Sequence, residues 1–304
     1  MDFCEVATCA LLRYGLRVPE LDFNDAALVV LGHGSTVNAA SSAPVFQHSA
    51  ELRRRRIFAS VHEAFWKQDP KILDVLRELT APRVFIVPFF ISEGYFAENV
   101  IPRALGFELG EVPASRVRQQ GSSRWHYCGP VGTHERMTSV LLERARGVVS
   151  QFPFPRLPKP GDVTLIIAGH GTEQDEASRK SVEAQVERIR ELGEYADVQP
   201  AFMEEEPRIA GCYRLARTRH VVVVPFFISD GMHTQEDIPV LLGEPARMVK
   251  ERMAAGQPTW RNPTEREGKL IWYAPAVGSE PVMAEVILER VREAAQWPAP
   301  VDNG

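Results

Sequence analysis

Val84-Phe-Ile-Val-Pro-Phe-Phe-Ile-Ser-Glu-Gly94 and Val221-Val-Val-Val-Pro-Phe-Phe-Ile-Ser-Asp-Gly231 are nearly identical stretches of this chain, and they stand 137 residues apart. The match continues at the same offset, without a gap, from about Leu28 to Pro102. Self-similarity at a constant spacing over such a length indicates an internal duplication. The chain is therefore expected to fold as two similar units.

The two copies are separated by a proline-rich segment. Four prolines stand among the residues of 151–161, and such a run cannot continue a helix or a central strand. We therefore expect a leader at 1–27, an N-terminal repeat at 28–155 and a C-terminal repeat at 156–304. The second copy is nine residues longer, because Val131 matches Val277 at an offset of 146.

Each copy alternates short apolar runs with segments of helical periodicity. The expected strands are 28–31, 84–90 and 126–128 in the first copy, and 165–168, 221–227 and 270–273 in the second. The expected helices are 43–64 and 72–79, then 177–192 and 209–216, with a last helix closing each copy. Wholly apolar strands that alternate with helices are typical of parallel sheets covered on both faces. The fold class is α/β, with two tandem domains that each contain a mainly parallel sheet.

Bulk composition excludes several classes of function. The 304 residues are 44% hydrophobic and 25% charged, and the formal net charge of -5 argues against a surface that tracks nucleic-acid phosphates. The chain has no apolar run long enough for a membrane helix and no secretory pattern at its start, so we expect a cytoplasmic protein without nucleic-acid or membrane partners. The four cysteines form no CxxC pair, which favours reduced structural thiols; a metal clip that includes Cys4 and Cys9 is the alternative.

Three side chains of the second copy are candidate metal ligands. His170 follows the first strand in a Gly-His-Gly turn, and His233 lies just beyond the second buried strand. Glu204 lies between the two histidines in the sequence, at the end of Phe202-Met-Glu204. Because parallel strands deliver their carboxyl ends to one edge of a sheet, His170 and His233 are expected to converge, and Glu204 offers an oxygen ligand from a neighbouring strand end. Two imidazoles and a carboxylate suit a borderline divalent ion such as cobalt, iron, nickel or zinc.

The first copy has lost two of these ligands. His33 survives opposite His170, but the register places Lys67 opposite Glu204 and Phe96 opposite His233. A single histidine beside glycine is more often a hydrogen-bonded turn residue than a ligand. Here the strand and turn framework is retained while the chelating groups are not, which favours the metal interpretation. The remaining histidines have no counterpart in the other copy and are interpreted as structural or surface residues: His48, His62, His126, His134 and His220.

These motifs resemble the class II tetrapyrrole chelatases, and most of all the sirohydrochlorin cobalto- and ferrochelatases, including their two-repeat form. The resemblance rests on Gly-His-Gly-Ser/Thr, on Phe-x-Glu, and on the pattern Pro-x-Phe-x-x-x-Gly-x-His-x-x-x-Asp-Ile-Pro that ends at Pro239. It covers roughly residues 28–295 and implies flavodoxin-like domains with the metal held by His170, His233 and Glu204. Two-repeat members usually keep the intact set in the N-terminal half, so which half of this chain receives the macrocycle is left open.

The resemblance implies an enzyme that inserts cobalt(II) or iron(II) into sirohydrochlorin, for cobalamin or siroheme biosynthesis. The metal, with nickel and zinc as further possibilities, is then a substrate, and no organic cofactor is expected. Sirohydrochlorin is a polycarboxylate, so basic residues are expected near the cleft. The candidates are Arg179, Lys180 and Arg208 in the C-terminal copy, with Arg103 and Lys67 facing them. The fused repeat is compatible with a monomer or a homodimer.

Two other classes of function are compatible with the same residues. A zinc-dependent hydrolase or lyase would use the three ligands to activate water, with Glu236 or Asp237 as an additional carboxylate. A storage or tetrapyrrole-binding protein would bind without turnover. The Arg53-Arg-Arg-Arg56 run points around most of a helix, so we interpret it as a solvated or partner-facing surface and not as a pocket.

Overall fold

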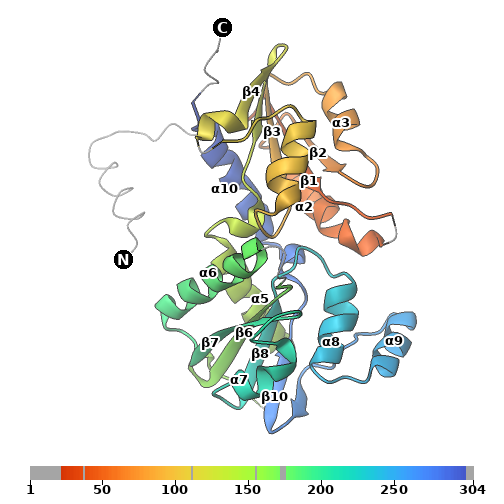
Figure 1. The fold of residues 1–304 in the computed structure, drawn as a ribbon, viewed down its shortest axis with the longest axis vertical. Coiled ribbons are helices and arrows are strands. Elements are labelled where there is room, and N and C mark those ends of the chain that lie inside the picture. The colour runs from red at the N-terminus through yellow and green to blue at the C-terminus, as the bar shows by residue number, and fades with distance from the viewer. Residues whose placement is uncertain (1–21, 37, 111, 155, 172–175, 299–304) are drawn as a thin grey trace.

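The computed structural model describes residues 22–36, 38–110, 112–154, 156–171 and 176–298. It contains two five-stranded sheets, with strand orders β2-β1-β3-β5-β4 and β7-β6-β8-β10-β9 (Figure 1). In each sheet four strands are parallel and the last edge strand is antiparallel. The strands of the first sheet are β1 (Ala26–Gly32), β2 (Ser60–Phe65), β3 (Arg83–Pro88), β4 (Val117–Gln120) and β5 (Ser123–Tyr127). Those of the second are β6 (Val163–Gly169), β7 (Asp197–Phe202), β8 (His220–Pro225), β9 (Thr264–Arg266) and β10 (Lys269–Tyr273).

Helices connect the strands in the same order in both repeats. The N-terminal repeat contains η1 (Ala39–Ser41), α2 (Ala43–Arg55), α3 (Ile72–Glu78), η2 (Phe96–Val100), α4 (Ile101–Ala104), η3 (Pro113–Arg116), η4 (Val131–Thr133) and α5 (Met137–Gln151). The C-terminal repeat contains η5 (Pro160–Asp162), α6 (Glu176–Leu192), η6 (Ile209–Gly211), α7 (Cys212–Leu215), η7 (His233–Asp237), α8 (Ile238–Leu241), α9 (Ala246–Ala254), η8 (Val277–Ser279) and α10 (Met283–Ala295). The expected α/β class with two tandem, mainly parallel sheets is confirmed.

Strand β1 shows why both faces of each sheet are covered. Its residues are all buried, and successive side chains alternate between the two faces. Leu28 and Val30 join the core cluster that includes α2, whereas Val29 and Leu31 join the cluster beneath α3 and α4. Because neither face meets water, the strand needs no polar alternation, and an uninterrupted apolar run results.

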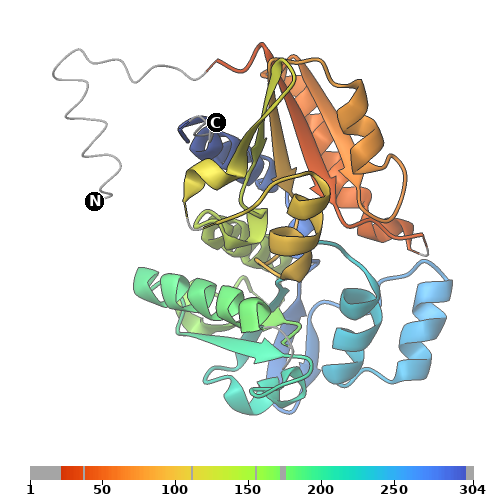
Figure 2. The ribbon, with the colours of Figure 1, turned by 45° about the horizontal axis from the view of Figure 1, so that its top comes forward.

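The last helix of each repeat packs on the sheet of the other repeat. Helix α10 lies against β3 and β5, while α5 lies against β8 and β10, as Figures 1 and 2 show. The His126 ring nitrogen Nδ1 bonds the Ala294 carbonyl at 3.0 Å, and the Trp272 indole donates to the Phe152 carbonyl at 2.8 Å. One cluster of buried apolar residues therefore runs through both repeats.

One expected helix was too long. The sequence predicted a helix over 43–64, but α2 ends at Arg55 and residues 60–65 form strand β2. Arg56 adopts a left-handed conformation, with φ of 54°, that terminates the helix. Strand β2 lies at the edge of the sheet and pairs with a neighbour on one side only. Such an edge strand contains both polar and apolar residues, and here their spacing resembles that of a helix. The corresponding edge strand β7 and the antiparallel strands β4 and β9 were also missed.

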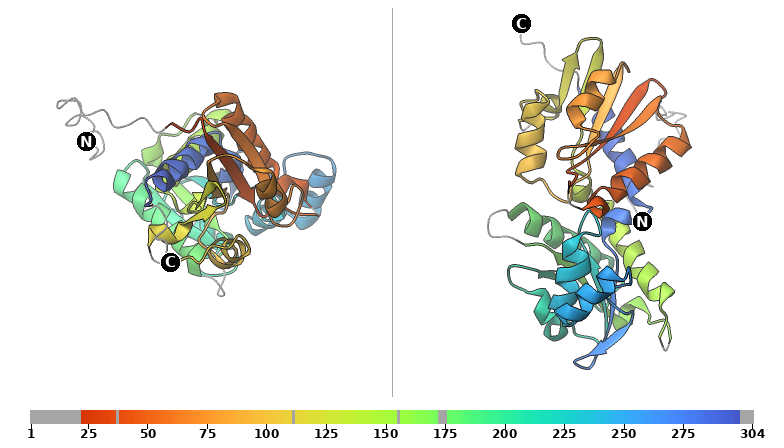
Figure 3. Two further views of the ribbon diagram at one scale, coloured as in Figure 1. Left: turned by 90° about the horizontal axis from the view of Figure 1, so that it is seen from above. Right: turned by 90° about the vertical axis from the view of Figure 1, so that its right-hand side faces the viewer.

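The additional residues of the second copy are located after α8. They supply α9 and the loop that follows it, which stand out beside α8 in Figure 3. The described part of the chain contains no helix with the length and apolar character needed to cross a bilayer.

Candidate functional site

His170 is presented by a sharp turn at the carboxyl end of β6. A Cβ on Gly169 would stand 2.6 Å from a Val182 methyl, so helix α6 approaches the strand too closely for a side chain there. Gly171 has φ of +61°, and a Cβ on it would lie 2.7 Å from Phe202 Cβ. Both glycines are therefore required by the turn, and the imidazole between them projects from the sheet edge.

His233 reaches the same edge from the neighbouring strand. It is the first residue of η7, a π-helix that begins eight residues after β8, and β8 pairs in parallel with β6. The ring centroids of His170 and His233 are 5.0 Å apart, although 63 positions separate the two residues. Single π-turns occur frequently at functional sites. The expected convergence of the two histidines is therefore present in the fold.

Glu204 approaches His170 from the other side. Strand β7 pairs with β6 and ends at Phe202, and the amide of Glu204 donates to the His170 carbonyl at 3.3 Å. Glu204 Oε1 then lies 3.7 Å from His170 Nε2. Within the described residues, no three His, Cys, Asp or Glu side chains are already gathered at metal-ligating positions. Bonds of about 2.0–2.2 Å to a metal such as zinc would therefore require the rings and the carboxylate to turn inward.

Asp237 is a further functional candidate, which the sequence suggested only as an additional carboxylate of a hydrolase or lyase. Its Oδ2 lies 2.7 Å from His233 Nδ1, one turn along the π-helix. A carboxylate on one imidazole nitrogen holds the proton there and leaves the other nitrogen free to bind a metal. A signal was available in the repeat, because the register places Val100 opposite Asp237. The first copy thus lacks both the second histidine and its carboxylate partner.

The equivalent positions in the first copy carry side chains that are not a metal-ligand set. The rings of His33 and Phe96 meet edge to face at 5.1 Å, and Lys67 Nζ stands 5.7 Å from the centre of the Phe96 ring. Burial and the nearby Lys67 ammonium lower the pKa of His33, against an opposing contribution from its bond to the Gly34 carbonyl. Lys67 and Phe96 therefore occupy the positions that the register predicted for them.

The basic candidates in the second copy are all paired with acids. Arg179 bonds Glu183 at 2.8 Å and Glu205 at 3.1 Å, and Lys180 bonds Glu176 at 2.7 Å. Arg208 Nε lies 3.7 Å from a carboxylate oxygen of Glu206. The pairs of Arg179 and Arg208 involve Glu205 and Glu206, which follow Glu204 directly. A substrate carboxylate would have to displace a protein carboxylate to reach any of the three.

Several other sequence interpretations agree with the structure. His48 and His126 are buried and bond backbone carbonyls across the interface between the repeats. Arg53 turns to Glu63 while Arg54 and Arg55 turn to Glu51. Arg54 and Arg55 line a pocket beside Glu51, but Arg53 and Arg56 are not part of its lining, so the four arginines do not share one pocket. The thiols of Cys128 and Cys212 are buried, which raises their pKa values. Cys4 and Cys9 lie outside the described residues.

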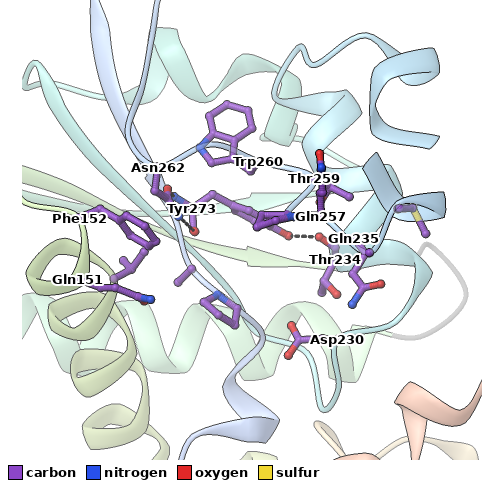
Figure 4. A pocket seen from close by; sticks show the side chains of 16 residues that line it. Gln151, Phe152, Asp230, Thr234, Gln235, Gln257, Thr259, Trp260, Asn262 and Tyr273 are labelled. Carbon is purple, nitrogen blue, oxygen red and sulfur yellow. Dashed lines mark hydrogen bonds between the residues drawn. The ribbon is translucent and has the colours of Figure 1, made fainter. Parts of the chain in front are cut away.

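A pocket of about 540 Å³ lies behind the π-helix (Figure 4). It is lined by the end of α5, by Thr234 and Gln235 of η7, and by the loop after α9 that only the second copy possesses. Tyr273 also lines this pocket, and its hydroxyl donates a hydrogen bond to the Thr234 carbonyl at 2.6 Å. Its described lining includes no Lys, Arg or His, so it is distinct from the His170–His233 site and unsuited to a polycarboxylate.

Comparisons with known proteins identify related chains. The CbiX family model matches residues 27–148 and again 164–294. A probable sirohydrochlorin cobaltochelatase of Halobacterium salinarum is 41% identical over 288 residues, which cover 91% of this chain and 93% of the relative. The sirohydrochlorin cobaltochelatase of Methanopyrus kandleri is 31% identical over 140 residues, covering 43% of this chain and 96% of its own length.

Solved structures share the fold. A multi-domain protein of Deinococcus radiodurans, described as structurally similar to chelatases, superposes with a TM-score of 0.71 at 28% identity. The match covers 87% of this chain and 54% of that longer protein. SirB from Bacillus subtilis with Fe3+ superposes with a TM-score of 0.60 at 18% identity, covering 89% of this chain and 96% of SirB.

Proposed function

The chain belongs to the CbiX family, and from this premise we infer that it is a metal chelatase that inserts a divalent metal ion into sirohydrochlorin. The observation that supports this most strongly is the 41% identity with the probable cobaltochelatase of Halobacterium salinarum, which extends over nearly the full length of both chains. Metal insertion requires a set of exchangeable metal ligands and an acceptor for two pyrrolic protons. The chain supplies its own candidates for each of these requirements.

We propose that His170, His233 and Glu204 bind the incoming metal ion. Neutral imidazoles bind the ion without neutralising its charge, and a single carboxylate leaves coordination positions open for exchange with the macrocycle. Asp237 accepts a hydrogen bond from His233 Nδ1–H and so keeps Nε2 available as the ligand. Partial exposure of all these side chains permits them to close around the ion and to release it.

The proton acceptor for the pyrrolic N–H groups comes from the same set in this proposal. When the metal moves to the macrocycle, the imidazole or carboxylate that it leaves regains a lone pair close to the departing protons. The geometry gives equal support to Glu204 and to the histidines as the acceptor. The metal is a substrate here, and we propose cobalt(II) ahead of iron(II) because the similar chains are cobaltochelatases.

Anaerobic incubation with sirohydrochlorin and either cobalt(II) or iron(II) tests the proposal, with the absorbance change of metal insertion as the readout. We expect wild-type protein to accelerate insertion, His233→Ala to abolish the acceleration, and Phe96→Ala to retain kcat at saturating sirohydrochlorin. Wild-type protein that is no faster than free metal would reject the chelatase. Tight stoichiometric zinc with water activation, or macrocycle binding without turnover, would then identify the hydrolase or the binding protein.

A further inference from the structure

The N-terminal copy has exchanged its metal ligands for side chains that suit a flat, anionic, apolar molecule. Tyr95 and Phe96 are 67% and 37% exposed, so both rings offer apolar surface to a ligand. Lys67 stands beside Phe96 with its ammonium group accessible. We propose that Tyr95, Phe96 and Lys67 form the wall that binds the macrocycle. This inference rests on the proposed function, because it takes sirohydrochlorin as the ligand.

Charge distinguishes the two copies at equivalent positions. Residues 204–206 of the second copy are three glutamates, whereas the register places Lys67, Gln68 and Asp69 opposite them. Arg179 and Arg208 pair with Glu205 and Glu206, whereas Glu204 has no Lys or Arg at ion-pair distance among the described residues. The Glu204 carboxylate attracts a divalent cation and repels a polycarboxylate. The equivalent segment of the first copy has no net charge and presents an ammonium group. The metal and the macrocycle are thereby directed to opposite copies.

The availability of the basic groups supports the same assignment. Arg179, Lys180 and Arg208 are each paired with a glutamate, as described above. Within the described residues, Lys67 has no carboxylate at ion-pair distance. A substrate carboxylate that binds Lys67 therefore displaces only water and the loose contact with the Phe96 ring. Binding at the paired bases would break an existing ion pair, which cancels most of the gain.

The loops beside the two sites meet across the interface between the repeats. Asn38, which follows β1, has its Nδ2 3.8 Å from where a Cβ on Gly231 would stand, and Gly231 lies two residues before His233. The buried His48 ring also bonds the Gly278 carbonyl at 2.7 Å, which joins the repeats near the same edge. Figure 2 shows the two repeats packed directly on one another. These contacts connect the loop after β1, whose His33 meets Phe96, with the loop that presents His233.

Metal-free sirohydrochlorin is the probe that tests this wall, since its binding can be followed anaerobically by fluorescence without turnover. We expect Phe96→Ala and Lys67→Glu each to weaken its binding by about tenfold, equivalent to about 1.4 kcal/mol. The KM for sirohydrochlorin should rise by the same factor while kcat at saturation stays within about twofold of wild type. Phe96→Leu and Lys67→Arg should restore most of the affinity, because they keep the apolar area and the charge.

Lys159→Glu is the matched control, because it makes the same charge reversal on an exposed residue of the linker. It should leave the Kd for sirohydrochlorin unchanged. The wild-type Kd should also rise with salt more steeply than that of Lys67→Gln, since exposed charge pairs are screened. If Phe96→Ala and Lys67→Glu both bound sirohydrochlorin as tightly as wild type, the proposed wall would be refuted, whereas the proposed chelatase function would not be affected. Failure of the proposed function would instead appear as wild-type protein that binds the macrocycle but inserts no metal.

Discussion

Replacement of Asp237 by asparagine should weaken metal binding without affecting the macrocycle. The carboxylate lies 2.7 Å from His233 Nδ1, within the range of a charge-assisted hydrogen bond. An asparagine amide has a similar shape, but it can donate to Nδ1. The ring proton then moves to Nε2, and the nitrogen that should bind the metal is blocked. The same reversal of tautomer explains why such a substitution is damaging in catalytic triads.

The size of the effect follows from the exposure of the pair. Loss of a carboxylate partner of a metal-binding histidine typically costs about 10–100-fold in metal affinity. The side chains of His233 and Asp237 are 48% and 44% exposed, so water competes with their bond and the lower end applies. We therefore expect the Kd for cobalt(II) and the KM for cobalt(II) to rise about tenfold in Asp237→Asn.

Titration with cobalt(II), followed by its visible absorption, measures the affinity directly, and steady-state insertion kinetics measure the KM. The control is Asp74→Asn, which removes an exposed aspartate paired with Arg77 on α3, far in sequence from the candidate ligands. It should change neither constant. Cobalt(II) affinity in Asp237→Asn equal to that of wild type would refute the idea that this carboxylate positions His233.

Three further predictions concern the duplication and the interface. Combined Lys67→Glu, Phe96→His and Val100→Asp substitutions should rebuild the lost site, so equilibrium dialysis should find a second cobalt(II) ion per chain; unchanged stoichiometry would contradict the register argument. Burial lowers the pKa of His126 to about 4, so its contribution to stability is present above about pH 6.5 and is lost as the pH falls towards 4. Between about pH 7 and about pH 5, wild type should lose about 2 kcal/mol more unfolding free energy than His126→Gln, and equal losses in urea titrations would count against this. Gly278→Ala should destabilise the protein by about 2–4 kcal/mol, because its Cβ would stand 1.7 Å from a backbone carbonyl oxygen; a melting temperature equal to that of wild type would disprove this steric conflict.

The position of the candidate ligands could be predicted because it depends on local rules. Apolar runs that end in glycine predict buried parallel strands, and parallel strands end at a common edge. The sequence therefore predicted that His170 and His233 would converge across 63 positions, and their rings lie 5.0 Å apart. The repeat added an internal comparison, so the replacement of Glu204 by Lys67 was visible without any structure.

Strands at the edges of the sheets and contacts between particular side chains could not be predicted in the same way. Strand β2 pairs on one side only, and its mixed sequence Ser60-Val-His-Glu-Ala-Phe65 has no strict alternation, so it was interpreted as the end of a helix. The bond between His233 and Asp237 lies within a π-helix. A spacing of four residues brings two side chains near one another on an ordinary helix as well, so the sequence alone did not indicate that these two would bond. Strand pairing decided the first case and a contact between two side chains decided the second, and hydrophobic periodicity encodes neither of them.

The sequence by itself determined the duplication, the α/β class and the copy that retains the chelating residues, because these follow from internal identity and from the periodicity of each segment. Only the tertiary structure decided that α5 and α10 are exchanged between the sheets and that Arg179 is paired with Glu205. The sequence of an amphipathic helix does not indicate which sheet covers its apolar face. Nor does the presence of an arginine indicate whether its guanidinium group is paired with a carboxylate. Such choices depend on contacts between distant segments, and those contacts exist only once the chain has folded.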